Sequence, residues 1–124
     1  MNNNINTSSI NAVMEIQREF PAIAYPAKHD SLIKQLFKVV QCFADYAKKQ
    51  LAEGNEAEVV HCYRTAHHIL QHGGNIAKVA IENVFISGVS KTLESSFSVS
   101  RNARPLFLQY FKKEYARHIS ASLA

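Results

Sequence analysis

The sequence predicts an all-α fold: a single-domain bundle of about five helices, built as two stacked helix-turn-helix units and a terminal helix. Apolar residues recur at helical spacing along most of the chain, and no segment alternates as a strand would. Only 4 glycines and 3 prolines occur in 124 residues, which favours long regular segments over a turn-rich β fold. The hydrophobic fraction of 47% is enough for one core, so we expect one domain over residues 1–124.

The first predicted helix covers residues 8–19. Residues 1–8 are polar and have neither a basic n-region nor an apolar h-region, so we expect a frayed N-terminus rather than a secretory signal. The apolar residues of this helix are Ile10, Val13, Met14 and Ile16. Residues 20–29 are expected to form an extended connector, because Pro21 and Pro26 cannot donate backbone hydrogen bonds. The apolar residues of the connector that should pack against the body are Phe20, Ile23 and Tyr25.

The second predicted helix begins at Asp30 or Ser31 and ends at Glu53. Either of the first two residues can cap the free N–H groups, and Gly54 can supply the left-handed residue that ends a helix. A stripe of apolar residues at helical spacing marks the buried face of this helix. The residues of the stripe are Leu32, Leu36, Val40, Phe43, Ala47 and Leu51.

The third predicted helix begins at Asn55, a common capping residue, and ends before Gly73 and Gly74. Its apolar residues gather on one side of a helical projection. They are Val59, Cys62, Tyr63, Ala66, Ile69 and Leu70. We expect Cys62 and Cys42 to be reduced and buried on apolar helix faces; whether the two are close enough for a disulfide stays open.

The fourth predicted helix covers residues 75–94 and is apolar on two sides, which is typical of a helix at the centre of a bundle. Glu82 lies within one of its apolar stripes and is a candidate buried carboxylate. Such a group needs a partner or a proton, and it could be a tuned carboxylate in a pocket or a member of a structural ion pair. We favour a structural ion pair, or a side chain that reaches solvent, over the tuned carboxylate. The candidate partners on the third helix are Arg64, His67 and Tyr63.

The fifth predicted helix covers residues 105–122, with Pro105 in its first turn, and follows a serine-rich loop. Residues 101–124 contain five of the 14 Lys and Arg but one of the 10 Asp and Glu. This segment therefore carries the whole net charge of +4. Tyr110, Lys113 and Arg117 should face outward, where they could contact nucleic-acid phosphates and bases or an acidic protein. Five basic residues without a recognition motif are few for nucleic acid, so we do not expect it as the partner.

Four of the six histidines lie on the third helix. His61, His68 and His72 fall on the side opposite its core face, and His67 lies at the boundary. His68 and His72 have the i, i+4 spacing that lets two imidazoles share a metal ion, so they are weak metal-site candidates. No Glu follows the first of them, as it would in a helical metalloprotease motif. We expect a surface that faces solvent or a partner, and no cofactor.

The sequence lacks the motifs of common enzyme classes: a glycine-rich phosphate loop, a nucleophile elbow and a paired-carboxylate motif. Cys62 lies mid-helix on the core side, where a catalytic thiol would have no access. No apolar run approaches the roughly 20 residues that cross a bilayer. We therefore expect a non-enzymatic, cytoplasmic protein-binding module without a membrane segment. Its candidate contact residues are His61, Arg64, His68, His72, Tyr110, Lys113 and Arg117.

Three segments carry a resemblance to a known family: "IQREFPAI", the long stretch from "LIKQLFKVV" to "RTAHHIL", and "GGNIAKVAIENVFISGVSKTLE". They resemble small bacterial all-helical domains of unknown function, with a Phe-Pro after the first helix and Gly-Asn turns between later ones. The resemblance covers roughly residues 10–94 and its motifs are structural. It implies an immunity-type protein, which neutralises a toxin by binding it, and it implies no catalytic residues. This chain differs in having a basic C-terminus.

Two alternative functions stay open. The first is a metal-binding protein or enzyme that uses the histidines of the third helix. The second is a weak nucleic-acid binder that uses the basic C-terminal helix. The oligomeric state also stays open, a homodimer included.

Overall fold

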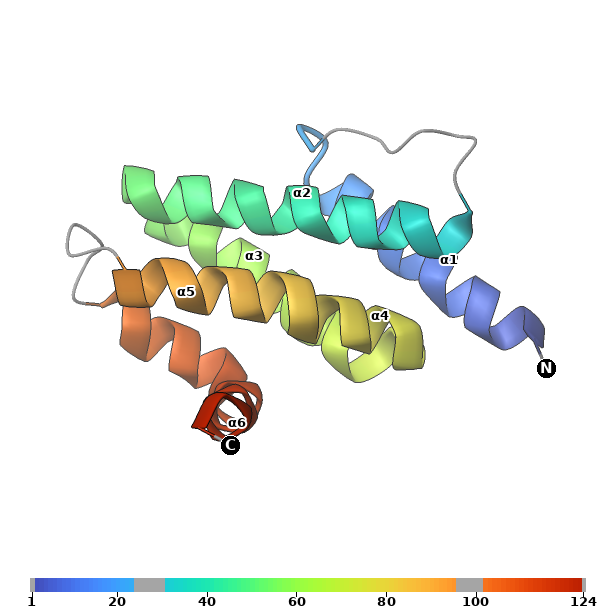
Figure 1. Ribbon diagram of the computed structural model, residues 1–124. Coiled ribbons are helices and arrows are strands. Elements are labelled where there is room, and N and C mark those ends of the chain that lie inside the picture. The colour runs from blue at the N-terminus through green and yellow to red at the C-terminus, as the bar shows by residue number, and fades with distance from the viewer. Residues whose placement is uncertain (1, 24–30, 96–101, 124) are drawn as a thin grey trace.

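The computed structural model describes residues 2–23, 31–95 and 102–123, and every regular element in these ranges is a helix (Figure 1). The elements are α1 (Asn2–Glu19), α2 (Leu32–Glu53), α3 (Glu56–His72), α4 (Gly74–Ala80), the π-helical turn η1 (Ile81–Ile86), α5 (Ser87–Ser95) and α6 (Ala103–Leu123). Because α4, η1 and α5 follow one another without a break, they form one continuous helix. The predicted all-α bundle is confirmed.

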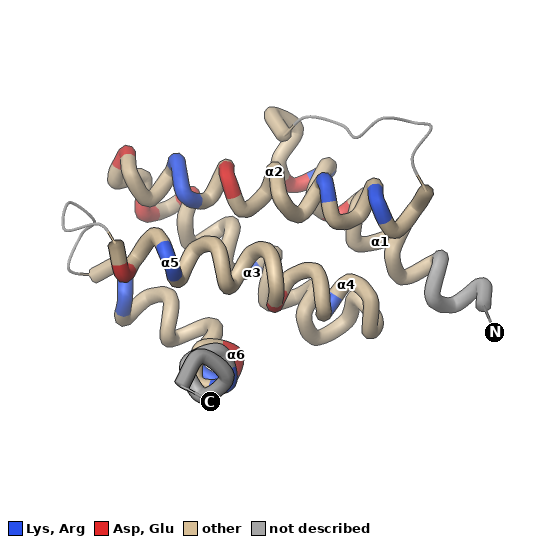
Figure 2. Tube along the Cα trace, viewed as in Figure 1, with Lys and Arg blue, Asp and Glu red and all other residues tan. Residues whose placement is uncertain are grey.

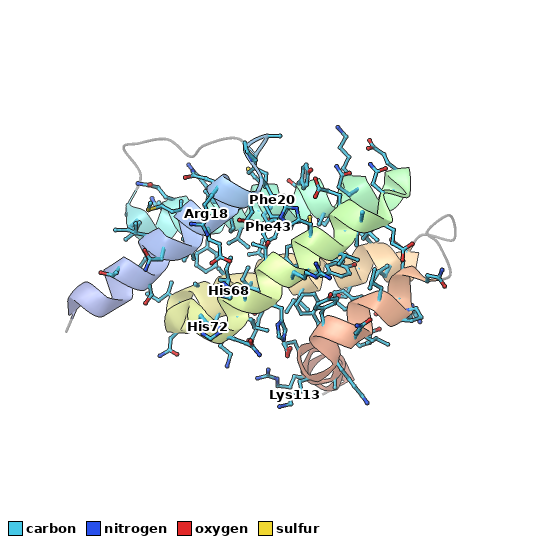
Figure 3. All side chains as sticks on the ribbon, turned by 180° about the vertical axis from the view of Figure 1, so that it is seen from behind. Arg18, Phe20, Phe43, His68, His72 and Lys113 are labelled. Atoms are coloured by element: carbon cyan, nitrogen blue, oxygen red, sulfur yellow. The ribbon has the colours of Figure 1, made fainter. Side chains whose placement is uncertain are left out.

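The helices pack in two layers. In Figure 1, α2 and the continuous α4–η1–α5 helix lie toward the viewer. The opposite view in Figure 3 brings α1, α3 and α6 to the front, with α3 between the other two. The buried apolar side chains of both layers form one cluster. In the layer formed by α1, α3 and α6, the N-terminal and C-terminal helices lie on either side of α3, and this order positions the side chains of the candidate site.

Local sequence chemistry sets the ends of α2. The Ser31 hydroxyl accepts a hydrogen bond from the Lys34 backbone N–H at 3.3 Å, as expected of an N-cap. Gly54 ends the helix at φ 74°, in the left-handed region that favours glycine. Asn55 departs from expectation, because its side chain makes no capping bond to α3. It donates instead to the Gln50 side-chain oxygen at 2.8 Å.

Helix α1 differs from its prediction at two points. It begins at Asn2, where a frayed N-terminus up to residue 8 was expected, and no proline or glycine in this stretch interrupts it. Ile10 and Met14, two of its four apolar residues named above, are 43% and 56% exposed. The buried side is lined by Ser9, Ala12, Val13 and Ile16. Ser9 and Ala12 are small, which allows close packing of this side of α1 against the body.

The connector after α1 begins as expected, since Phe20 and Ile23 are buried. The rest of this predicted connector, with Tyr25 and Pro26, lies outside the described residues, as does most of the serine-rich loop before α6. Helix α6 bends at Phe111, whose φ of −130° and ψ of 29° are not helical. The sequence analysis predicted an unbroken helix here, and the bend coincides with a fully buried residue.

The close approach of α1 to the body can be tested at Gly74. A Cβ at this position would lie 2.9 Å from the Cβ of Ser8, and the residue has φ 83°. Gly54 is a matched control, because it has φ 74° but an added Cβ there would meet nothing within 4 Å. We expect Gly54→Ala to cost about 1 kcal/mol of unfolding free energy from backbone strain alone. Gly74→Ala should cost about 1–3 kcal/mol more, because the added methyl also clashes.

Urea unfolding followed by circular dichroism measures both values. Equal losses for the two variants would show that α1 does not press on Gly74.

Candidate functional site

The histidines of α3 point to different neighbours. His61 and His68 contact α1, whereas the ring of His67 lies 6.1 Å from the ring of Tyr110 on α6. The sequence analysis placed His61, His68 and His72 on a side facing away from the core. It could not show that α1 packs along that side. Helix α3 therefore makes contacts through its histidines with two helices, α1 and α6, and does not expose all of them on one open side.

The contact with α1 consists of two histidine–carboxylate pairs, which we name the α1–α3 clasp. His61 Nε2 lies 2.9 Å from Glu19 Oε1, and His68 Nδ1 lies 2.8 Å from Glu15 Oε2. The His61 ring also packs on Phe20, with centroids 4.3 Å apart. His61 is half-buried as a result. This predicted contact residue is therefore already engaged within the protein.

A second carboxylate extends the clasp toward α2. His61 Nδ1 lies 2.8 Å from Glu58 Oε1, and the Tyr46 hydroxyl donates to Glu58 Oε2 at 2.5 Å. Both nitrogens of His61 thus face acceptors, an arrangement that suits the imidazolium, which donates from both. The cluster joins side chains from α1, α2 and α3.

These contacts shift the titration of the cluster. The hydrogen bond with Glu19 raises the pKa of His61, with a further contribution from Glu58 and an opposing one from burial. The same bond lowers the pKa of Glu19. Tyr46 and then His61 lower the pKa of Glu58. Hydrogen bonding to Glu58 raises the pKa of Tyr46 to about 12. The cluster therefore stabilises the imidazolium form of His61 between two carboxylates, relative to a free histidine.

His68 and His72 have centroids 4.8 Å apart and are both exposed. Within the part of the chain that the structure describes, no group of three or more His, Cys, Asp or Glu side chains is placed to hold a metal ion. The pair by itself offers two ligands, whereas zinc sites in proteins use at least three. Glu15 already occupies Nδ1 of His68.

Both cysteines are free thiols. Cys62 is buried, as expected, and its burial raises the pKa of the thiol to about 12. Such a thiol carries almost no thiolate at neutral pH, so it is a poor nucleophile. Cys42 is half-buried rather than fully buried.

Glu82 forms an ion pair, but with a partner that the sequence analysis did not name. It is half-buried on η1, and its Oε1 lies 3.5 Å from Arg117 Nη2 of α6. Arg117 also lies 3.8 Å from Glu114. The proposed partners on α3 are elsewhere: Arg64 is exposed, and Tyr63 is enclosed by aromatic rings. Helix α6 packs against η1 and so brings Arg117 to the carboxylate of Glu82.

The remaining candidate residues lie on α3 and α6, two helices that pack against each other. Arg64, His68, His72 and Lys113 are exposed, and Figure 3 shows Lys113 on α6 in the same view as His68 and His72 on α3. Tyr110 is half-buried, with its ring 6.0 Å from that of Tyr63 on α3. We name the α3–α6 face by its six residues: Arg64, His67, His68, His72, Tyr110 and Lys113. Arg117 is exposed but bound to carboxylates, which reduces the charge that α6 offers to a phosphate.

Sequence reasoning missed Glu15, Glu19, Tyr46 and Glu58 as parts of the site. A signal was present, because Glu15 and Glu19 are four residues apart on one helix and His61 and His68 are seven apart on another. Residues four or seven apart lie on the same face of a helix, so the two carboxylates can pair with the two imidazoles when the helices pack.

The chain matches the family described as "Domain of unknown function (DUF7674)" over residues 13–121. The chain belongs to this family. Membership confirms the expectation of an uncharacterised family. Comparison with curated proteins and with solved structures finds no match. None of the described helices is both long and apolar enough to cross a membrane.

The α1–α3 clasp gives a pH-dependent stability. Because the pKa of His61 is raised in the folded protein, its contribution is fully present below the ordinary value of 6.5 and is lost as pH rises through the folded value. We expect wild type to exceed His61→Gln in unfolding free energy by more at about pH 5.5 than at about pH 9. The difference should be at most about 1 kcal/mol, because the pair is partly exposed.

Urea unfolding at both pH values measures this. His72→Gln is the control, since among the described residues His72 has a ring contact with His68 but no carboxylate partner. A difference between wild type and His61→Gln that stays constant with pH would contradict the role given to the imidazolium.

Proposed function

We propose that the protein is a non-enzymatic, cytoplasmic protein-binding module whose partner docks on the α3–α6 face. The observation that supports this most strongly is the packing of Tyr110 on α3. Its ring lies 6.0 Å from that of Tyr63 and 6.1 Å from that of His67. This contact supports a docking face that is built from two distant parts of the sequence.

The chemistry of this face suits a protein partner that carries acidic groups. Arg64 and Lys113 are exposed cations without a carboxylate partner among the described residues. Tyr110 adds a half-buried aromatic ring, and Tyr and Arg are enriched in protein interfaces. Cationic groups of this kind steer association with an acidic surface.

The cellular setting is part of the proposal. The free thiols of Cys42 and Cys62 suit a reducing compartment such as the cytoplasm. An immunity-type role in a bacterial cell, in which the protein neutralises a toxin by binding it, is the specific form that the sequence resemblance supports. Such a role needs an exposed docking face and no catalytic residue.

Site-specific photo-cross-linking in the native host tests the proposal. A photoreactive amino acid at Arg64 or at Lys113 should yield the same covalent adduct, which mass spectrometry identifies as a second protein or a second copy of this chain. The same amino acid at Lys49 is the control, because Lys49 is exposed on α2, which belongs to the other layer. An adduct that forms equally at all three positions, or at none of them, would contradict docking on this face.

A further inference from the structure

A concave surface lies in the other layer and is lined by residues of α2, η1 and α5. Figure 1 shows these helices toward the viewer. The concave surface has a volume of about 430 Å³. We name it the α2–α5 groove. The polar residues in its lining that matter here are Gln41, Lys48, Asn83, Ser87, Lys91 and Thr92. It shares no residue with the α3–α6 face.

Two lysines give the groove a positive charge, and its lining contains no carboxylate. Figure 2 shows basic positions on both α2 and α5. The Asp45 carboxylate lies beside the lining, and its Oδ1 forms a long ion pair with Lys48 Nζ at 3.8 Å. The Asp45 carboxylate already accepts from the Gln41 amide at 3.0 Å. The Lys48 ammonium group is therefore held near the groove with donors to spare.

The side chain of Lys48 packs over Gly88. A Cβ on Gly88 would lie 3.1 Å from both Cε and Nζ of Lys48, so the lysine side chain crosses α5 where the helix has no side chain. The side chain of Lys48 is only 32% exposed as a result. A lysine packed in this way loses less conformational entropy on binding an anion than a fully exposed one.

The π-helical turn η1 supplies another part of the lining. The backbone N–H of Ser87 bonds to the carbonyl of Glu82, five residues earlier. Asn83 lies within this turn, and Ser87 follows it directly. Such turns are rare and occur frequently at functional sites. The π-helical turn is therefore a reason, independent of the two lysines, to expect a ligand in the α2–α5 groove.

We propose that the α2–α5 groove binds a small phosphate monoester, with the phosphate at Lys48 and Lys91. Two ammonium groups match a dianion, and lysine is a common phosphate ligand. The amide of Asn83 and the hydroxyl of Ser87 add donors beside the two ammonium groups, and several donors suit the three terminal oxygens of a phosphate better than the two of a carboxylate. The volume exceeds that of a bare phosphate and falls within the roughly 300–1,000 Å³ typical of small-molecule sites.

Titration of the full-length ¹⁵N-labelled protein with phenyl phosphate, followed by NMR, tests the proposal. We expect saturable shifts of the amides in residues 83–92. The dissociation constant should rise roughly tenfold in Lys48→Gln and in Lys91→Gln, since each removes a charge-assisted hydrogen bond. Lys49→Gln is the matched control: it removes the same charge from the neighbouring exposed position, and it should leave binding unchanged.

Three results would overturn the proposal. Equal weakening by Lys49→Gln would show that only net charge matters. Shifts that do not saturate, or that appear away from the groove, would show that no site exists. Binding of phenylacetate as tight as that of phenyl phosphate would remove the phosphate assignment. Retained far-ultraviolet circular dichroism in each variant confirms that the fold is intact.

Discussion

A chain of aromatic rings connects the two layers of the described structure. Phe20, which follows α1, lies 5.1 Å from Phe43 of α2, and Phe43 stacks on Phe85 of η1 at 4.6 Å. Phe85 in turn contacts Tyr63 of α3 and Phe111 of α6. Because aromatic side chains bury large areas in defined mutual geometries, this chain fixes how the two layers sit on each other. Both proposed surfaces depend on it.

One residue in this series of aromatic rings, Tyr63, has a polar group without a partner among the described residues. The Tyr63 hydroxyl is buried without a hydrogen-bond partner among the described residues, and burial raises its pKa. Leaving such a group unpaired costs about 1–3 kcal/mol. The ring compensates through edge contacts with Phe107 and Phe111, at 5.8 and 5.5 Å. The Tyr63 ring also contacts that of Tyr110, so the α3–α6 face depends on the ring of Tyr63 rather than on its hydroxyl.

Features that depend on neighbouring residues could be predicted from the sequence, and features that depend on helix packing could not. The ends of α2 at Ser31 and Gly54 follow from capping and backbone preference, which are local. The partner of Glu82 was missed because Arg117 reaches it only when α6 packs on η1. His61 was placed on an open side for the same reason, since α1 covers that side. Exposure of Ile10 and Met14 depends on which side of α1 packs on the body, and their apolar character does not reveal that.

The π-helical turn has a consequence for the length of the central helix. A hydrogen bond that spans five residues instead of four takes up one additional residue, which rotates everything after the turn by about 100° relative to an unbroken α-helix. Helix α4 can therefore present its buried face to α1 and α3 while α5 presents its own to α2 and α6. The number of residues between Ile81 and Ile86, as much as their identity, decides which side chains of α5 reach the groove. The number of residues in this segment therefore sets the rotation of α5, and a comparison of side-chain types alone would miss this effect.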